Sequence, residues 1–262
     1  MSNTTLHNEN VSVTLKSLGA ELTSIKDASG TEYLWQGNPE FWSGQAPVLF
    51  PIVGCLRNGT ATIGDNKTCS FGRHGLARRL EFDLVSSSDT SVTYSLKAND
   101  KTKEQYPYDF ELQMTYELTE HGVKVSHTVI NHDSVVMPYC VGGHPAFNCP
   151  VFENESFEDY IVEFEQPENA ACAQLTEDGL INNADRVSVI ENEAVIPVRH
   201  SLFYKDALVF DALKSRKVAL KHKKTGHGIL VSFPDFDYLG VWSSANDGPF
   251  VALEPWSGTS TC

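Results

Sequence analysis

Two short segments, separated by more than a hundred residues, each place a proton-transfer side chain among glycine, proline and aromatic residues. One is Gly142–Asn148, which contains His144, and the other is Leu253–Gly258, which contains Glu254. A histidine and a carboxylate held apart by the size of a small ring can protonate one oxygen while they deprotonate another. These two proton transfers are the minimum needed to open a cyclic hemiacetal. The pair therefore indicates acid–base chemistry on a sugar.

Residues 33–78 add further polar groups with the right character. Arg57 precedes Asn58-Gly59, so a turn there presents the fixed fork of guanidinium donors to ligand hydroxyls. His74 precedes Gly75, which allows a tightly curved backbone that aims the imidazole into a cleft. The same stretch is rich in aromatic rings that can stack on sugar faces, although large aromatics usually belong to cores. We favour a core position for Trp35 and Phe50.

The remaining histidines receive structural or solvent-exposed interpretations. Two of them precede a glycine in an evident turn, and five others lie in tails, strand faces or loops: His121 and His227, then His7, His127, His132, His200 and His222. We expect no catalytic or metal-binding role for them.

The hydrophobic residues that must position these groups recur with a period of two along most of the chain, as in half-buried strands. The pattern predicts a hairpin of Phe110–Leu118 and Val123–Val129 about the turn at Glu120-His121-Gly122. Further strands are predicted at 11–15, 92–96, 160–164, 218–221 and 229–233. Helical periodicity is confined to 39–42 and 201–207. The chain shows no internal repeat and no linker, so we predict one domain, residues 1–262, that is an all-β, large antiparallel two-sheet β-sandwich.

Composition limits the classes of function. Hydrophobic residues make up 41% of the 262 residues, which excludes a disordered chain, and the net charge of −14 opposes binding to nucleic acid or to an anionic membrane. No run of about 18 apolar residues is present, so no membrane span is expected. The polar start, Met1–Asn10, has no leader-like apolar stretch, and the six cysteines form no CxxC pair. We therefore expect a cytoplasmic protein with reduced thiols.

The whole set of motifs resembles the aldose 1-epimerase (galactose mutarotase-like) family, in particular its less characterised bacterial branch. The resemblance rests on the run from Tyr33 to Arg78, on Gly-Gly-His-Pro-Ala-Phe-Asn and on Glu-Pro-Trp-x-Gly, in that order along nearly the whole chain. It implies a β-supersandwich with no metal and no organic cofactor. It also implies the site residues and their roles: His144 as the acid at the ring oxygen, Glu254 as the base at the anomeric hydroxyl, and His74, Arg57 and Asp206 as residues that hold the sugar.

Two positions depart from the family pattern. Arg73 stands before His74, where a neutral residue is expected, and this predicts a more cationic site. The chain ends at Cys262, soon after Glu254, whereas relatives run on into further strand.

A carboxylate with an ordinary pKa of about 4.3 is a weak base. Glu254 therefore needs a raised pKa to act as the base, and apolar cover by Pro255 and Trp256 can supply it.

Three functions remain open from the residues. The leading one is interconversion of the anomers of a small-molecule sugar by a monomer or homodimer, with a free hexose favoured over a phosphorylated one. Arg78 beside His74 is the candidate for binding a phosphate. The second is a non-catalytic carbohydrate-binding protein on the same scaffold. The third is a glycoside hydrolase or lyase, which usually needs a second carboxylate such as Asp206.

Overall fold

The computed structural model describes residues 2–64 and 66–262, and it is almost entirely β-structure, with 49% of residues in strands and 7% in helices. This confirms the predicted all-β class. The strands are β1 (Asn3–His7), β2 (Val11–Lys16), β3 (Glu21–Asp27), β4 (Val48–Leu49), β5 (Thr60–Ile63), β6 (Lys67–Ser70), β7 (Asp83–Ser87), β8 (Ser91–Lys97), β9 (Phe110–Leu118), β10 (Val123–Asn131), β11 (Gly142–Gly143), β12 (Ala146–Asn148), β13 (Tyr160–Leu175), β14 (Ile181–Pro197), β15 (Leu208–Phe210), β16 (Lys217–His222), β17 (Gly228–Ser232), β18 (Tyr238–Trp242) and β19 (Phe250–Trp256). The helices are α1 (Asp100–Gln105) and four 3-10 turns, η1 (Arg57–Gly59), η2 (Ala77–Arg79), η3 (Phe157–Asp159) and η4 (His200–Leu202).

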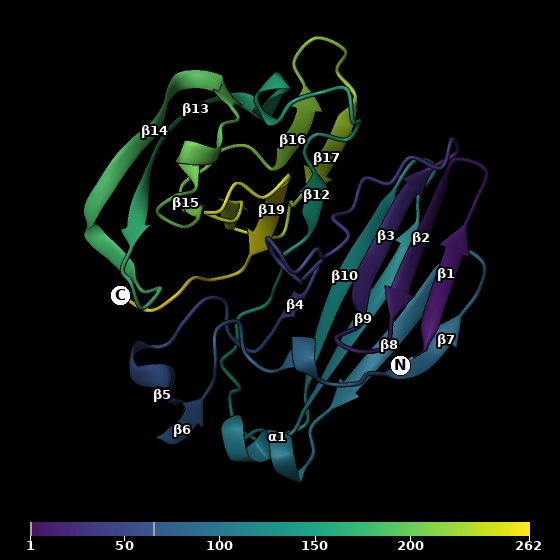
Figure 1. Ribbon diagram of the computed structural model, residues 1–262. Coiled ribbons are helices and arrows are strands. Elements are labelled where there is room, and N and C mark those ends of the chain that lie inside the picture. The colour runs from purple at the N-terminus through teal and green to yellow at the C-terminus, as the bar shows by residue number, and fades with distance from the viewer. Residues whose placement is uncertain (1, 65) are drawn as a thin grey trace.

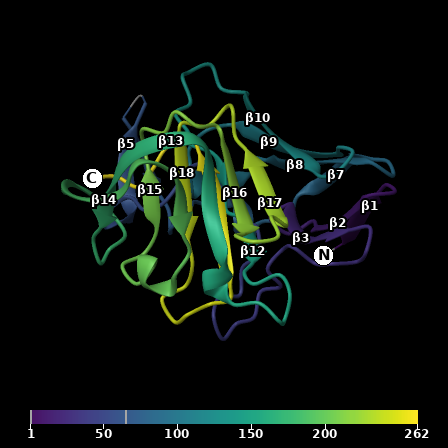
Figure 2. The same cartoon turned by 90° about the horizontal axis from the view of Figure 1, so that it is seen from above.

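The strands form several antiparallel sheets that lie in two groups (Figure 1). One group contains β1-β2-β3 and β10-β9-β8-β7. The other contains β14-β13-β16-β17 and the sheet β15-β18-β19-β11-β4, with β12 also paired to β19. Figure 2, seen from above, shows β13, β16 and β17 side by side, with strands β1–β3 and β7–β10 at the right of the view. The small hairpin β5-β6 stands apart from both groups.

Most predicted strands lie within observed ones because the alternation marks a real buried face. In β2, for example, Val11, Val13 and Leu15 are buried while the residues between them are partly exposed. The predicted hairpin is the β9–β10 pair, in which Val123 faces Leu118. The helix predictions were wrong or imprecise: residues 39–42 form turns, and of 201–207 only the start joins η4.

The one α-helix, α1, was not predicted from the hydrophobic pattern. Its N-terminus is stabilised by capping rather than by an apolar face. The Asn99 side chain accepts hydrogen bonds from the backbone N–H groups of Lys101 and Thr102, and the Thr102 hydroxyl oxygen accepts one from the backbone N–H of Asn99. Such a capping box stabilises a short helix that periodicity cannot reveal.

Large aromatic residues and aliphatic side chains fill a common core between the sheets. Tyr116 on β9 donates to the backbone carbonyl of Ala20 at 2.6 Å, which ties the two sheets of the first group together. Phe50, beside β4, packs on Phe110 with ring centroids 5.1 Å apart, and this joins the two groups. Phe50 is fully buried and Trp35 is 6% exposed, as expected for core residues.

The six cysteines occur as free thiols in the described chain, as expected from the missing CxxC pairs. Among residues 2–64 and 66–262, no helix is both long and apolar enough to cross a membrane.

Candidate active site

Strand β19 brings the two distant motifs together. The segment 142–148 pairs with β19 on both sides of His144: Gly142 faces Trp256 and Ala146 faces Ala252. In this antiparallel register the positions halfway between are His144 and Glu254. The backbone N–H of Leu253 donates to the carbonyl of Pro145 at 3.1 Å and closes the gap between β11 and β12. The Gly-Gly-His-Pro run thus interrupts a strand at the point where an acid–base side chain faces Glu254.

The side chains of His144 and Glu254 are in direct contact. His144 Nε2 lies 3.2 Å from Glu254 Oε2, and the two side chains are 9% and 1% exposed. The sequence suggested groups spaced by the size of a ring, whereas the structure places them side by side. Because the ring oxygen and the anomeric hydroxyl of a sugar are bonded to the same carbon, adjacent groups suit both oxygens.

Three aromatic rings enclose the imidazole of His144. Trp42 stacks on it with centroids 4.9 Å apart, and Trp242 and His74 meet it edge-on at 5.4 and 5.5 Å. The Trp42 carbonyl accepts a hydrogen bond from the indole of Trp35 at 2.8 Å, which anchors this loop to the core. The rings fix the plane of His144 and exclude water from it.

Burial changes the proton affinity of both members of the pair. It lowers the pKa of His144 to about 3, and the charges of Arg78 and Arg73 act in the same direction. Burial also raises the pKa of Glu254 well above its usual range, and the Asp206 charge adds to this, while Arg73 and the Trp256 side chain oppose it. Because burial disfavours the charged form of each group, the resting pair favours a protonated Glu254 beside a neutral His144. The raised pKa of Glu254 matches the sequence-based expectation for a base.

His74 occupies the strained turn that its sequence predicted. Its φ is 67° and that of Gly75 is 75°, and a Cβ at position 75 would lie 2.3 Å from the Phe50 carbonyl oxygen. The backbone N–H of Gly54 donates to His74 Nδ1 at 3.0 Å. Burial, with the charges of His144, Arg78 and Arg73, lowers the pKa of His74 well below its usual value. The ring is therefore neutral with its proton on Nε2, a donor for a sugar oxygen.

Asp206 and Arg73 form an ion pair next to Glu254. Arg73 Nη2 lies 3.1 Å from Asp206 Oδ2, and the other Asp206 oxygen accepts from the backbone N–H of Ala207 at 2.8 Å. Both charges act on the Glu254 carboxyl, in opposite directions. The extra positive charge that Arg73 brings is thus partly neutralised, a compensation that the sequence analysis missed because the two residues are far apart in the chain.

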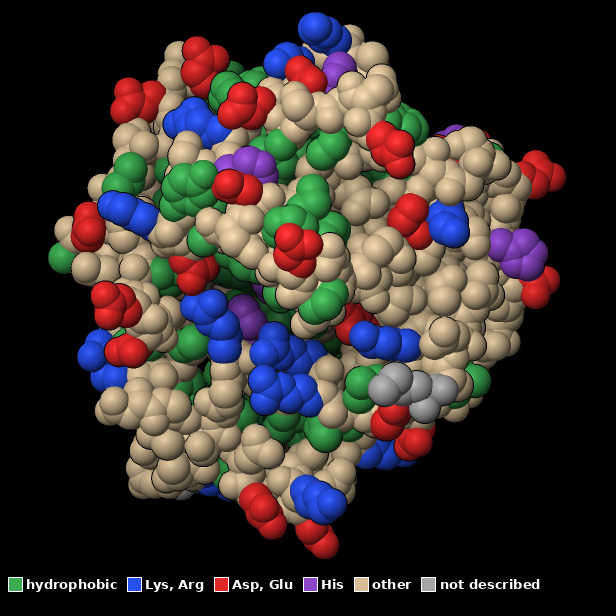
Figure 3. Space-filling view, in the orientation of Figure 1, with side chains coloured by type: hydrophobic (Ala, Val, Ile, Leu, Met, Phe, Trp, Pro, Cys, Tyr) green, Lys and Arg blue, Asp and Glu red, His purple; other side chains and the backbone are tan. Residues whose placement is uncertain are grey.

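Arg78 is a half-buried cation on η2 whose charge acts on both His74 and His144. In the described part of the chain no hydrogen bond or ion pair holds its guanidinium, and burial lowers its pKa. Figure 3 shows Lys and Arg side chains gathered beside a depression in which a histidine is visible.

Arg57 lies outside the contacts of the acid–base pair. It forms the predicted turn with Asn58 (φ 56°), is exposed, and donates from its guanidinium to the carbonyl of Cys262. Together with Arg73 and Asp178 it lines a cavity of about 390 Å³. Arg57 therefore connects with the site through Arg73 and not through His144 or Glu254.

The site also contains a residue that the sequence did not single out. Trp242, at the end of β18, gains its position because Trp242 pairs with Ala252 on β19, two residues before Glu254. Its signal in the sequence was only the end of an apolar strand. Three possible metal ligands lie away from the pair of His144 and Glu254, at the hairpin of β16 and β17: Glu155, His222 and His227. The chemistry that the side chains of His144 and Glu254 can provide is the donation and removal of protons.

Comparisons with known proteins agree with the observed fold. The model of the aldose 1-epimerase family matches residues 2–262. The chain is 45% identical over 262 residues to the plasmid-encoded protein LacX of Lactococcus lactis subsp. lactis, covering 98% of this chain and 88% of that protein. Two of the similar solved structures come from Lactobacillus species. One is a galactose mutarotase related enzyme from Lactobacillus acidophilus (TM-score 0.92, 32% identity, 99% of this chain and 86% of the other). The second is a galactose mutarotase-like protein from Lactobacillus casei (TM-score 0.90, 31% identity, 99% and 89%).

Proposed function

The chain belongs to the aldose 1-epimerase family, and from that premise we propose that it interconverts the α and β anomers of an aldohexose by opening and closing the sugar ring. Family membership indicates an isomerase. The observation that carries the proposal is the buried contact of 3.2 Å between His144 Nε2 and Glu254 Oε2. It provides a proton donor and a proton acceptor for two oxygens on one carbon.

The reaction needs two proton transfers in each direction. The proton of the pair moves from Glu254 to His144 when the sugar binds. The Glu254 carboxylate then removes the proton of the anomeric hydroxyl, while His144 donates its proton to the ring oxygen. The bond between the anomeric carbon and the ring oxygen breaks, and an open-chain aldehyde forms. After rotation about the adjacent carbon–carbon bond, the hydroxyl attacks the other face of the aldehyde. It returns its proton to His144, and Glu254 returns its proton to the carbonyl oxygen.

The neighbouring polar groups are placed to hold the sugar. His74 presents a neutral Nε2–H donor, and Asp206 and Arg73 offer an acceptor and donors beside Glu254. We propose that Arg57 contributes from the rim, through the cavity that it shares with Arg73. Trp42 and Trp242 keep water away from the reacting pair, which strengthens the electrostatic interactions within it.

A hexose phosphate is the second candidate substrate, because Arg78 is a partly desolvated guanidinium that no ion pair holds among the described residues, although the charge of Glu21 acts on it. A phosphate can accept its donors bidentately. The Arg73 guanidinium, in contrast, is already paired with Asp206. Free hexose stays the leading substrate, since the proton chemistry at His144 and Glu254 is the same for both.

Anomer-exchange NMR on a panel of free hexoses and their 6-phosphates tests the proposal. We expect exchange well above the uncatalysed rate for at least one free hexose. Binding of sugars without faster exchange would contradict the enzyme and favour a carbohydrate-binding protein. Cleavage of oligosaccharides would favour a hydrolase. Arg78→Glu should abolish any preference for the phosphorylated sugar. Equal exchange rates for the free and the phosphorylated sugar, before and after the change, would contradict the phosphate as a recognised group.

We further propose that residues 1–262 act as one domain, which is supported by a family match over nearly the whole chain. The free thiols of the described chain are consistent with a cytoplasmic location. A monomer or a homodimer both fit a site built by one chain, and sedimentation of the purified protein would distinguish them.

A further inference from the structure

Three potential metal ligands meet at the β16–β17 hairpin. His222 ends β16, His227 precedes β17, and Glu155 comes from the segment between β12 and η3. One ligand atom of each lies within 4.8 Å of the other two. None is strongly exposed: the His222 residue is 7% exposed, and the side chains of His227 and Glu155 are 23% and 10% exposed. The proposed mechanism uses none of them.

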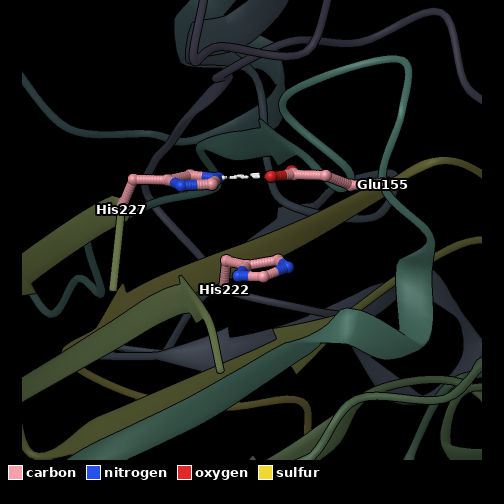
Figure 4. A group of neighbouring side chains, drawn as sticks. All are labelled: Glu155, His222 and His227. Atoms are coloured by element: carbon pink, nitrogen blue, oxygen red, sulfur yellow. Dashed lines mark hydrogen bonds and ion pairs between the residues drawn. The ribbon is translucent and has the colours of Figure 1, made fainter. Parts of the chain in front are cut away.

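The Glu155 carboxylate is already oriented toward this hairpin. His227 Nε2 lies 3.1 Å from Glu155 Oε1 (Figure 4). Tyr160 donates its hydroxyl hydrogen to Glu155 Oε2 at 2.5 Å. The carboxylate is thus fixed by partners at the ends of two strands, with its oxygens directed toward the histidines.

Thr225 connects the two imidazoles from behind. Its hydroxyl oxygen lies 2.7 Å from His227 Nδ1 and 2.9 Å from His222 Nδ1. His222 Nδ1 also accepts from the backbone N–H groups of Lys224 and Thr225, at 3.3 and 3.2 Å, while His227 Nε2 faces Glu155. Histidines that bind metals usually hold their second nitrogen by such a hydrogen bond, which fixes the ring orientation.

We propose that Glu155, His222 and His227 form a binding site for a divalent cation of the zinc type. Imidazole nitrogen and carboxylate oxygen are characteristic zinc ligands, at about 2.0–2.2 Å from the metal. In the metal-bound state each neutral ring binds through Nε2 and carries its proton on Nδ1, facing the Thr225 oxygen. For His222 this replaces the hydrogen bonds that its Nδ1 accepts from the backbone N–H groups of Lys224 and Thr225. Water or the Tyr160 oxygen completes a tetrahedral set.

Binding requires only small side-chain movements. Bond lengths of that size in a tetrahedron place the ligand atoms about 3.4 Å apart, so the set has to contract from its present spread of up to 4.8 Å. The rings of His222 and His227 now lie stacked, with centroids 5.2 Å apart and planes 10° apart. His227 Nε2 already faces Glu155, so the His222 ring has to move most, by rotation about its Cβ–Cγ bond, which is a broad torsion.

The ion would stabilise the fold rather than take part in proton transfer. It would join the segment that leads from β12 to η3 with the β16–β17 hairpin, two parts of the chain that are distant in sequence. The inference does not rest on the proposed function, because its ligands lie on other strands than His144 and Glu254.

Calorimetric titration of the untagged protein with zinc chloride, after dialysis against a chelator, tests the site. We expect saturation at one zinc per chain and a higher melting temperature with zinc, since a ligand that binds only the folded state stabilises it. Thr225→Val removes the outer hydrogen bonds and should weaken binding about 10–100-fold. His227→Gln and Glu155→Gln remove ligands and should weaken it further. His121→Gln is the matched control, because His121 lies 3.5 Å from Glu120 in an exposed pair without a second histidine.

The outcomes are distinguishable from those of the activity assay. Absence of saturable zinc binding by the wild type, or equal affinity in the Thr225, His227 and Glu155 variants, would overturn the site. Thr225 is exposed, so its variant should fold and decide the matter even where a ligand variant does not. Anomer exchange by chelated protein below its melting temperature should equal that of the zinc-loaded protein.

Discussion

At the scale of single residues, the buried contact between His144 and Glu254 is the basis for proposing that they act as one proton-transfer unit. Glu254→Gln and His144→Gln each keep much of the shape but remove the transfer. General acid–base catalysis contributes about 10²–10⁴-fold, so kcat for anomer exchange should fall by that factor, with KM changed far less. The double variant should lose less than the product of the two losses. Wild-type kcat in both single variants, on every accepted sugar, would refute the assignment.

Trp42 is a positioning residue for His144, since its ring stacks on the imidazole. A side chain at position 44 would collide with it, because a Cβ on Gly44 would lie 2.4 Å from the Trp42 ring. Trp42→Leu should let the imidazole tilt and admit water, and small misplacements of a catalytic group can cost about 10²-fold in rate. We therefore expect a fall in kcat of about 10–100-fold, with an altered pH profile, measured by exchange NMR. Trp35→Phe is the control, and an equal loss in both variants would indicate a merely structural role.

The sequence was informative about these residues only where the chemistry was local. Glu254 and His144 were recognised from their glycine- and proline-rich surroundings, and His74 from the glycine that follows it. The Arg73–Asp206 ion pair and the position of Trp242 depend on strand register and loop contacts across the sheet, which no local pattern contains. The roles assigned to the site residues stay predictions until variants are measured.

At the scale of elements, the turn at His74-Gly75 holds His74, the proposed sugar-binding donor, against Phe50. Gly75→Ala would suffer both the left-handed φ of 75° and the clash with the Phe50 carbonyl. The φ penalty alone is about 1 kcal/mol, and the clash should raise the loss of unfolding free energy beyond about 2 kcal/mol. Gly226→Ala is a matched control: its φ is 78°, but nothing lies within 4 Å of the added Cβ. Urea unfolding of both variants measures the difference, and similar losses would contradict the close approach at Gly75.

The longer strands were predictable because alternation of apolar and polar residues records burial on one face of a sheet. Short elements escaped because they depend on caps and on tertiary contacts. β11 and β12 contain only two and three residues, and they are strands solely because β19 pairs with them. That pairing sets His144 opposite Glu254, so the decisive feature of the site lay beyond local sequence patterns.

At the scale of the whole molecule, buried histidines make the folded state sensitive to acid. Burial lowers the pKa of His127 to about 4 and that of His144 to about 3, from 6.5 in the unfolded chain. The folded state therefore binds fewer protons than the unfolded state, so the stability that these groups contribute above pH 6.5 is lost as the pH falls toward their folded pKa values. Glu254 acts in the opposite direction, because its raised pKa favours the folded state at low pH.

His127 gives the clearest test of this acid sensitivity, since it lies outside the catalytic pair and its Nε2 is buried without a hydrogen bond among the described residues. One proton contributes about 1.4 kcal/mol per pH unit, so between pH 6.5 and 4 the His127 term amounts to about 3 kcal/mol of unfolding free energy. Urea unfolding at pH 7.5, 6.5, 5.5 and 4.5 should show a shallower decline for His127→Gln than for the wild type, whatever the offset at pH 7.5. The exposed His121 provides the comparison, because His121→Gln should leave the slope unchanged. Parallel curves for His127→Gln and the wild type would mean that the His127 ring takes up its proton without unfolding the protein.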